Sequence, residues 1–170
     1  MIEITPSTTV YAILDSYPEL EEVLIGMAPA FKKLKNPILR NTVAKVATLK
    51  QAASVGGIEL TEMISILRRT AGQSELDTIF DKQDYLVKKP SWFYPDKIVG
   101  SINESTLEDK NKMPITFVLK KARNMKEGEI FEFVTSFLPA PAIDLIIKKG
   151  YESWTYKEND TLYKSYFKKK

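Results

Sequence analysis

Residues 129–167, EIFEFVTSFLPAPAIDLIIKKGYESWTYKENDTLYKSYF, decide the architecture of the C-terminal half of the chain. Their first nine positions are rich in Phe and Val and predict a β-strand. Pro139 or Pro141 then begins a helix that ends at Gly150, because proline suits the first turn of a helix and glycine suits its end. The remainder alternates apolar and polar residues around Glu158-Asn159-Asp160, which predicts a β-hairpin.

The residues before this stretch supply one more strand and one more helix. Residues 97–103 have the pattern of a strand, and Pro114 opens a helix whose apolar residues recur on one stripe. The order is therefore β-α-β-α-β-β, which predicts a two-layer α/β sandwich with both helices on one face of a four-stranded sheet. Trp154 and Tyr156 fall on one face of the hairpin and Tyr151 on the other; since helices cover only one face, we expect a strap, a domain, a second subunit or a ligand to cover the remaining aromatic surface.

Residues 8–72 predict a helical domain of five short helices around one core. Pro37 opens one of these helices, since proline is well suited to a first turn. Thr48, followed three residues later by Gln51, has the form of a capping box, and Gly56-Gly57 ends the helix that it starts. The buried residues expected on the last helix are Leu60, Met63, Ile64 and Leu67.

The sequence thus divides into a helical domain at residues 1–75, a linker at 76–95 and an α/β domain at 96–170. The linker contains Trp92-Phe93-Tyr94 between two prolines. Exposed rings are costly, at about 25 cal/mol per Å² of apolar surface. We therefore expect this segment to pack on a domain as a strap, with Trp92 buried and the two domains fixed relative to each other.

The composition is that of an ordinary globular protein, with 44% apolar and 28% charged residues among 170. No apolar run approaches the roughly 18 residues that a membrane helix needs. The first residues, Met-Ile-Glu-Ile-Thr-Pro, lack the basic end and apolar stretch of a signal peptide. We expect a cytoplasmic protein without a membrane partner.

Cysteine and histidine are both absent from the chain. Without cysteine there is no thiolate nucleophile, persulfide carrier, disulfide or iron–sulfur ligand. Without histidine the usual zinc and haem ligands and the Ser-His-Asp mechanism are missing as well. Only carboxylates, lysines, tyrosines and hydroxyls remain for chemistry, so we expect no cofactor and no metal site.

The net charge of +3 equals the charge of the terminal run Lys168-Lys169-Lys170. Residues 1–75 carry eight basic and eight acidic side chains, and residues 96–170 carry fourteen and eleven. A frayed lysine tail usually keeps a protein soluble. Counting charges along the chain therefore predicts no basic face and disfavours nucleic acid as a partner.

Three stretches of the N-terminal half resemble a helical family known as domain of unknown function 1858. They are Tyr17-Pro18-Glu19-Leu20-Glu21-Glu22-Val23-Leu24, Pro29-Ala30-Phe31-Lys32-Lys33-Leu34 and Asn36-Pro37-Ile38-Leu39-Arg40. Relatives in that family include small redox-disulfide-like proteins with paired cysteines. The corresponding stretch here, Ile25-Gly26-Met27-Ala28-Pro29, has none, so a redox or metal role is not implied.

The C-terminal half resembles domain of unknown function 2249, which shares the fold of the TusA sulfur carriers. The residues that carry this resemblance are Met113-Pro114, Glu127-Gly128-Glu129 and Phe137-Leu138-Pro139-Ala140-Pro141-Ala142-Ile143-Asp144. The resemblance implies a TusA-like sandwich. The sulfur carriers place a Cys-Pro pair at the start of the first helix, whereas this chain has Met113, whose thioether cannot form a persulfide.

Two groups of residues are candidate binding sites. In a β-α-β-α layout both helices begin at the edge where the parallel strands end, and free N–H groups at helix starts favour anions. The residues predicted to line that edge for a small anion are Asn103, Asn111, Lys112, Met113, Phe137 and Pro139. A second surface for an anion or a partner contains Lys32, Lys35 and Arg40, although such a run usually forms a solvated helix face.

Residues 49–67 also fit a helix-turn-helix template, with Ala53 and Gly57 at the tight crossing. The base-reading positions would be Glu59, Thr61, Glu62 and Ser65. Because two of these are acids that would repel phosphate, a generic helical hairpin is the simpler interpretation. Glu104, Glu108 and Asp109 suggest acid–base chemistry or Mg²⁺ binding, but they lie in a polar stretch that favours a loop.

These observations favour a non-enzymatic binding or regulatory protein whose partner is a small anion or another protein. One alternative is an enzyme subunit that uses carboxylate or lysine chemistry at the edge where the helices start. Another is a helix-turn-helix regulator that binds DNA. Self-association through the exposed sheet face is a further expectation.

Overall fold

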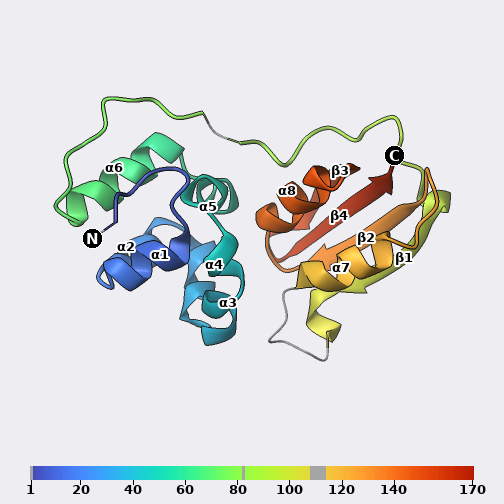
Figure 1. Ribbon diagram of the computed structural model, residues 1–170, viewed down its shortest axis with the longest axis horizontal. Helices are drawn as coiled ribbons and strands as arrows, with labels where there is room; N and C mark the ends of the chain where they lie inside the picture. The colour runs from blue at the N-terminus through green and yellow to red at the C-terminus, as the bar shows by residue number, and fades with distance from the viewer. Residues whose placement is uncertain (1, 82, 108–113) are drawn as a thin grey trace. The chain divides into compact units, whose positions relative to one another are not determined.

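The computed structural model describes residues 2–81, 83–107 and 114–170. The chain forms two compact units, Met1–Asp84 and Tyr85–Lys170, and each is described by itself (Figure 1). Within the described residues, no helix has the length and apolar character that crossing a membrane requires.

The first unit is helical. Its elements in chain order are α1 (Val10–Ser16), α2 (Leu20–Met27), the 3₁₀ helix η1 (Pro29–Lys35), α3 (Pro37–Asn41), α4 (Val43–Val46), α5 (Leu49–Gly56) and α6 (Leu60–Thr70). The capping box of Thr48 and Gln51 is present, and Gly57 ends α5 with φ of +67°, so both predictions are confirmed.

The prediction of five helices is wrong in one region. The helix expected after Pro37 is divided into α3 and α4 at Thr42. The Thr42 hydroxyl donates to the carbonyl of Ile38 at 2.7 Å, a back-bond that competes with the helical ladder and bends helices. The segment Pro29–Lys35 adds a 3₁₀ helix to the five that were expected.

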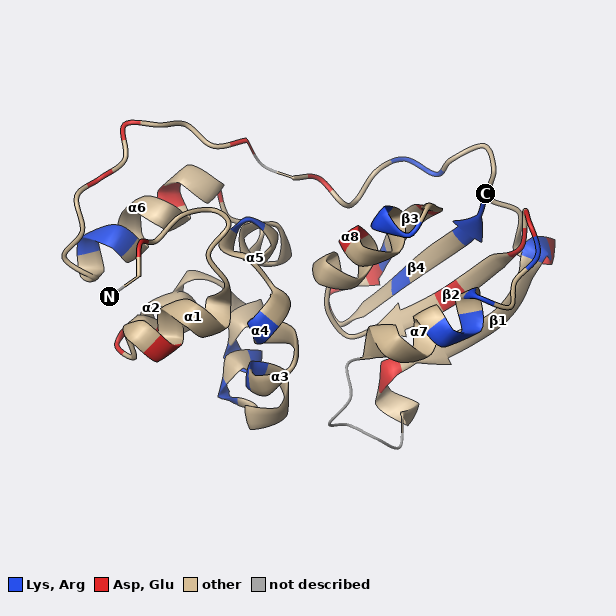
Figure 2. Cartoon of the chain, viewed as in Figure 1, with Lys and Arg blue, Asp and Glu red and all other residues tan. Residues whose placement is uncertain are grey.

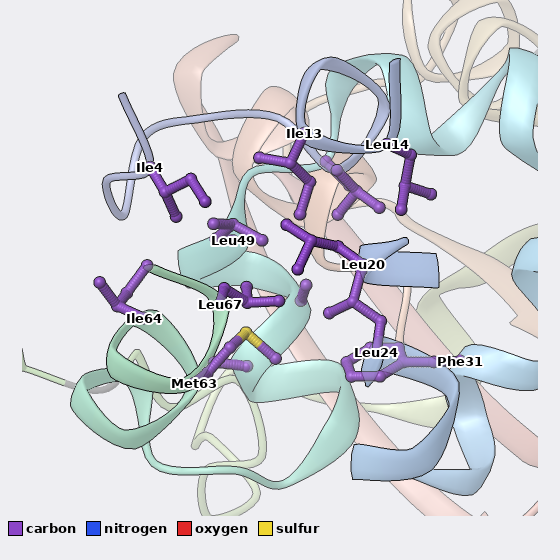
Figure 3. Close-up of a cluster of buried hydrophobic side chains, with 14 of the residues drawn as sticks. Ile4, Ile13, Leu14, Leu20, Leu24, Phe31, Leu49, Met63, Ile64 and Leu67 are labelled. Carbon is purple, nitrogen blue, oxygen red and sulfur yellow. The ribbon is translucent and has the colours of Figure 1, made fainter. Parts of the chain in front are cut away.

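The core of the first unit is built from side chains of α1, α2, η1, α4, α5 and α6 and of the N-terminal segment (Figure 3). Ile4 lies against it before the first helix, and α6 contributes Met63, Ile64 and Leu67, which are fully buried as predicted. Phe31 of η1 closes the other side of the same core.

A buried arginine, Arg68, binds both the N-terminal segment and the chain that follows α6. Arg68 is only 4% exposed, and its guanidinium donates to the carbonyl oxygens of Ile4 at 2.8 Å and Ser74 at 2.6 Å. Gln73 follows, and its amide nitrogen donates to the carbonyl of Ile2 at 2.8 Å. These bonds hold the chain that leaves α6 beside the N-terminal segment.

The second unit has the predicted order of strands and helices. Its elements are β1 (Ile98–Asn103), α7 (Pro114–Ala122), β2 (Ile130–Thr135), α8 (Ala140–Lys148), β3 (Tyr151–Asn159) and β4 (Leu162–Lys169), with short 3₁₀ helices η2 (Pro95–Lys97) and η3 (Glu104–Thr106). The sheet order is β1-β2-β4-β3; β1 and β2 are parallel, and β4 is antiparallel to both of its neighbours. Figure 1 shows α7 and α8 on one face of this sheet, which confirms the predicted two-layer arrangement.

The terminal lysines are not a frayed tail. Lys168 and Lys169 belong to β4, which lies between β2 and β3. The ammonium of Lys168 pairs with Glu152 at 2.8 Å, and that of Lys169 donates to the carbonyl of Met125 at 2.7 Å. The prediction of a loose tail is therefore wrong, because sheet pairing and carbonyl contacts hold two of its three residues.

Of the strap predicted at residues 76–95, residues 85–94 lie across the open face of the sheet, whereas Leu76 and Phe80 pack on the core of the first unit. The Phe93 ring lies edge-on against Trp154 and Tyr166, with centroid distances of 4.7 and 4.5 Å. The Trp154 indole donates to the carbonyl of Val87 at 3.1 Å. Trp92, which was expected to be the buried ring, is only half-buried, because Phe93 occupies the space between the two sheet aromatics.

We expect Phe93→Ala to lower the free energy of unfolding by about 2–3 kcal/mol, since it removes a half-buried ring from an aromatic cluster. Tyr94→Ala is the matched control, because Tyr94 is 58% exposed and its loss changes stability by only about 0.5 kcal/mol. Denaturant unfolding followed by circular dichroism measures both. Equal effects of the two substitutions would show that the strap does not stabilise the sheet.

Candidate functional site

The edge where the helices start is occupied by the protein's own oxygens. β1 ends at Asn103, and the carboxylate of Glu104, the next residue, accepts from the backbone N–H and the hydroxyl of Ser136 at 2.6 Å each. The side-chain oxygen of Asn103 accepts from the backbone N–H and hydroxyl of Ser105 at 3.0 and 2.8 Å. An anion that bound Ser136 would have to displace Glu104.

The other residues predicted for this edge are only partly described. Phe137 is half-buried, and its carbonyl accepts from the Thr135 hydroxyl at 2.7 Å, while Pro139 is buried at the start of α8. Asn111, Lys112 and Met113 lie outside the described residues, as do Glu108 and Asp109. The described part of the chain therefore brings Asn103, Phe137 and Pro139 to one edge, and the ligand there stays a prediction.

No group of three or more acidic side chains suited to a metal ion occurs among the described residues. Carboxylates of the second unit instead have partners within the protein. Glu132 accepts from the Ser101 hydroxyl at 2.8 Å, Asp144 accepts from Tyr85 at 2.8 Å, and Glu158 pairs with Lys164 at 2.8 Å.

The predicted surface of the first unit is largely neutralised. Arg40 forms an ion pair with Glu21 at 2.5 Å, and Lys35 lies 3.3 Å from Glu22. Lys32 is exposed beside them. Two of the three cations are therefore compensated by acids of α2, and the surface carries little net positive charge.

The helix-turn-helix surface is also covered. The hydroxyl of Thr61, one of the predicted base-reading residues, accepts from the backbone N–H of Phe80 at 2.9 Å. The hydroxyl of Ser54 on α5 donates to the carbonyl of Gln83 at 2.6 Å. The chain that follows α6 thus runs across α5 and α6. It covers part of the surface that a helix-turn-helix protein would place against DNA.

The opposite end of the second unit gathers basic side chains that lie far apart in the sequence. Two contacts hold them together: the Tyr151 hydroxyl donates to the carbonyl of Ala122 at 2.9 Å, and the ammonium of Lys169 donates to the carbonyl of Met125. The first contact joins the start of β3, which follows α8 closely, to the end of α7, and the second joins the end of β4 to the segment that follows α7. We call the exposed cations there the basic cluster: Lys120, Lys121, Arg123, Lys126, Lys148 and Lys149.

The basic cluster contains more cations than acids: one exposed acid, Glu127, follows Lys126 directly. Its six side chains form no ion pair within the described part of the chain. Glu152 at this end is paired with Lys168, and Glu129 accepts from the backbone N–H of Lys126 at 2.7 Å. Residues 85–170 carry sixteen basic and eleven acidic side chains, and Figure 2 shows Lys and Arg at the ends of α7, α8 and β4.

Counting charges along the sequence missed this cluster, because its members come from two segments, residues 120–126 and 148–149, that meet only in the folded unit. The topology of the sheet, in contrast, predicts that these chain ends meet. Helices that follow parallel strands both end at the edge where those strands begin, and a last strand antiparallel to them also ends there.

The open face of the sheet contains one tyrosine with altered acidity. Burial under the strap, and next a hydrogen bond to the Glu132 carboxylate, raise the pKa of Tyr166 well above its usual value. Its ring also stacks on Trp154 at 5.4 Å between centroids. Tyr166 therefore stays protonated and serves as a structural donor.

Residues 4–64 match the family described as Domain of unknown function (DUF1858). The match covers most of the first unit and confirms the resemblance of the N-terminal half. No curated protein and no solved structure matches the chain.

The raised pKa of Tyr166 predicts a loss of stability in base. The phenol ionises in the unfolded chain at about pH 10 but resists ionisation in the folded one, so its contribution is complete below about pH 10 and falls as pH rises further. One such group changes the free energy of unfolding by up to about 1.4 kcal/mol per pH unit. Urea unfolding above about pH 10 should show a smaller pH dependence for Tyr166→Phe than for the wild type, and identical slopes would contradict this assignment.

Proposed function

We propose that this chain is a non-enzymatic binding protein and that its second unit holds an anionic ligand at the basic cluster. The observation that carries the proposal is the meeting of three cationic chain segments through Tyr151 and Lys169. Cations at a helix end are stabilising by themselves, at about 0.3–1 kcal/mol each. Six exposed cations without acidic partners exceed what two short helices need for that purpose.

A role without catalysis is supported by the chemistry that the side chains offer. The chain has neither cysteine nor histidine. Three carboxylates of the second unit, Glu104, Glu132 and Asp144, accept hydrogen bonds within the protein and hold segments together. Acid–base chemistry at the edge where the helices start is therefore the weaker alternative.

Self-association through the open face of the sheet is also weaker than the sequence suggested. The strap already covers Trp154, one of the two aromatic residues that were the reason to expect a partner, together with Tyr166. Tyr156, 48% exposed, is the aromatic residue that this face leaves open to solvent.

The proposal includes a relation of the second unit to domain of unknown function 2249 and to the TusA-like sandwich. The β-α-β-α-β-β order with both helices on one face supports it. In this relation the chain has the sandwich fold of the sulfur carriers but not the cysteine that carries sulfur. Anion binding at the helix ends is then a function different from sulfur transfer.

Binding of short inorganic polyphosphate tests the proposed function, because this probe carries charge and little else. We expect the wild-type chain to bind it with an affinity that falls steeply as salt rises, since bound counterions are released. The variant Lys120→Gln/Lys121→Gln/Lys148→Gln/Lys149→Gln should bind at least about tenfold more weakly. Titration calorimetry at two salt concentrations measures both.

The matched control is Lys32→Gln/Lys35→Gln/Lys45→Gln/Lys50→Gln, which removes the same charge from the first unit. It should bind polyphosphate as the wild type does. Equal losses in the two variants would mean that net charge alone is responsible, and loss only in the control would place the site on the first unit. Native mass spectrometry of the freshly purified chain would show whether a bound anion is retained.

A further inference from the structure

We propose that the anion held by the basic cluster is the backbone of a single-stranded nucleic acid, whose bases stack on Trp92 and Tyr94. This inference rests on the proposed function and deepens it. The added observation is that the strap brings aromatic rings and cations to the same end of the sheet as the cluster.

The position of the strap follows from the sheet register. Ile98 begins β1 opposite Ile130 of β2, and Ile130 lies opposite Lys168 of β4. Tyr94 and the rest of the strap therefore reach the sheet at the end where Lys168 and Lys169 lie. The Lys168 ammonium is 5.8 Å from the centre of the Trp92 ring, which places that ring beside the end of β4.

Cations lie on both sides of the rings of the strap, with one acid, Asp96, next to Lys97. Lys88, Lys89 and Lys97 are exposed, and they flank Trp92, which is half-buried, and Tyr94, which is 58% exposed. The ammonium of Lys89 lies 5.1 Å from the centre of the Phe93 ring beneath. Phe93 anchors the segment in the sheet, and its two neighbours stay accessible.

Cations and accessible aromatic rings together form the usual surface for single-stranded nucleic acid. The cations follow the phosphate backbone, and the rings stack with bases of any sequence. A duplex keeps its bases stacked inside and cannot use Trp92 or Tyr94 in this way. An acidic protein would be attracted by the lysines but would gain little from flat rings at this place.

The consecutive lysines at the ends of the strand and the helices also suit a nucleic-acid strand better than they suit a single small anion. Lys168 points to the open face with Trp92, whereas Lys169 points to the helix face and contacts the end of α7. Lys168 is paired with Glu152, so it is Lys169, which has no ion pair among the described residues, that adds positive charge at the end of the sheet, on the path between the strap and the basic cluster. A flexible strand can follow such a path, and its affinity then depends on several phosphates at once.

This conclusion differs from the expectation that nucleic acid is a poor partner. That expectation rested on a loose lysine tail and on the absence of a basic face. Lys168 and Lys169 are instead part of the sheet, and the helix ends supply the face.

The test compares four probes of similar charge on the full-length chain: oligo(U), oligo(dT), a duplex, and inorganic polyphosphate. We expect the two single strands, each of about twelve nucleotides, to bind at least about fivefold more tightly than polyphosphate or duplex, because stacking adds to the backbone contacts. They should also quench the emission of Trp92, which Trp154→Phe isolates because Trp154 is the second of the two tryptophans. Preference for oligo(U) over oligo(dT), or the reverse, identifies which single strand is the natural one.

Tyr94→Ser and Trp92→Leu separate stacking from charge. Each should weaken the binding of the single strands at least about fivefold and leave polyphosphate affinity unchanged. Tyr94 is exposed, so its substitution keeps the fold even if that of Trp92 disturbs the strap. Tyr156→Ser is the control ring, since Tyr156 is 48% exposed on β3, toward the β3–β4 turn and away from the strap end of the sheet.

The outcomes distinguish this inference from the proposed function. If polyphosphate and single strands bind equally and the ring variants change nothing, the site holds polyanions and the nucleic-acid inference is wrong. Tighter binding of the duplex or of polyglutamate than of oligo(U) would also overturn it. If no polyanion binds, both proposals fail.

Discussion

The second unit depends on one topological constraint: its last strand lies in the middle of its sheet. β4 pairs with β2 on one side and with β3 on the other, so the sheet is incomplete until the end of the chain is in place. The same strand sends Phe167 into the core beneath the helices and Tyr166 to the open face beneath Phe93. Its final residues then reach the end of α7, where the Lys169 ammonium meets the carbonyl of Met125. The core, the strap and the basic cluster are all positioned by this strand.

The two ends of the sheet differ in charge for the same reason. Where the parallel strands end, the protein places Glu104 on Ser136, and the turn between β3 and β4 pairs its own lysines with Glu158 and Asp160. Where the helices end, lysines and Arg123 face solvent without such partners. The arrangement agrees with the helix dipoles, which favour cations at their carboxyl ends. It also gives the unit one strongly positive end, and that end is where we place the ligand.

The order of helices and strands could be predicted from the sequence, because its apolar periodicity indicates their type and prolines and glycines mark nearly every boundary. The capping box at Thr48 and the αL glycine at Gly57 could be predicted for the same local reason. The division of the helix after Pro37 could not, since the sequence does not show that the Thr42 hydroxyl bonds back to the Ile38 carbonyl. The basic cluster could not be found by counting charges, because Tyr151 and Lys169 join its parts only in three dimensions. The packing of Phe93 between Trp154 and Tyr166 likewise depends on how the strap crosses the sheet. The candidate edge at Asn103 and Pro139 was placed correctly as an edge, but the internal bond from Glu104 to Ser136 has no signature in the sequence.

The most direct measurement is a nuclear magnetic resonance titration of the ¹⁵N-labelled full-length chain with oligo(U). The account predicts that the amide signals that shift come from residues 88–97, 120–126, 148–151 and 168–170, which together outline the strap and the basic cluster. Signals of the first unit should stay in place. Shifts confined to residues 103–105 and 135–140 would contradict the account, since they would place the ligand at the edge where the helices start.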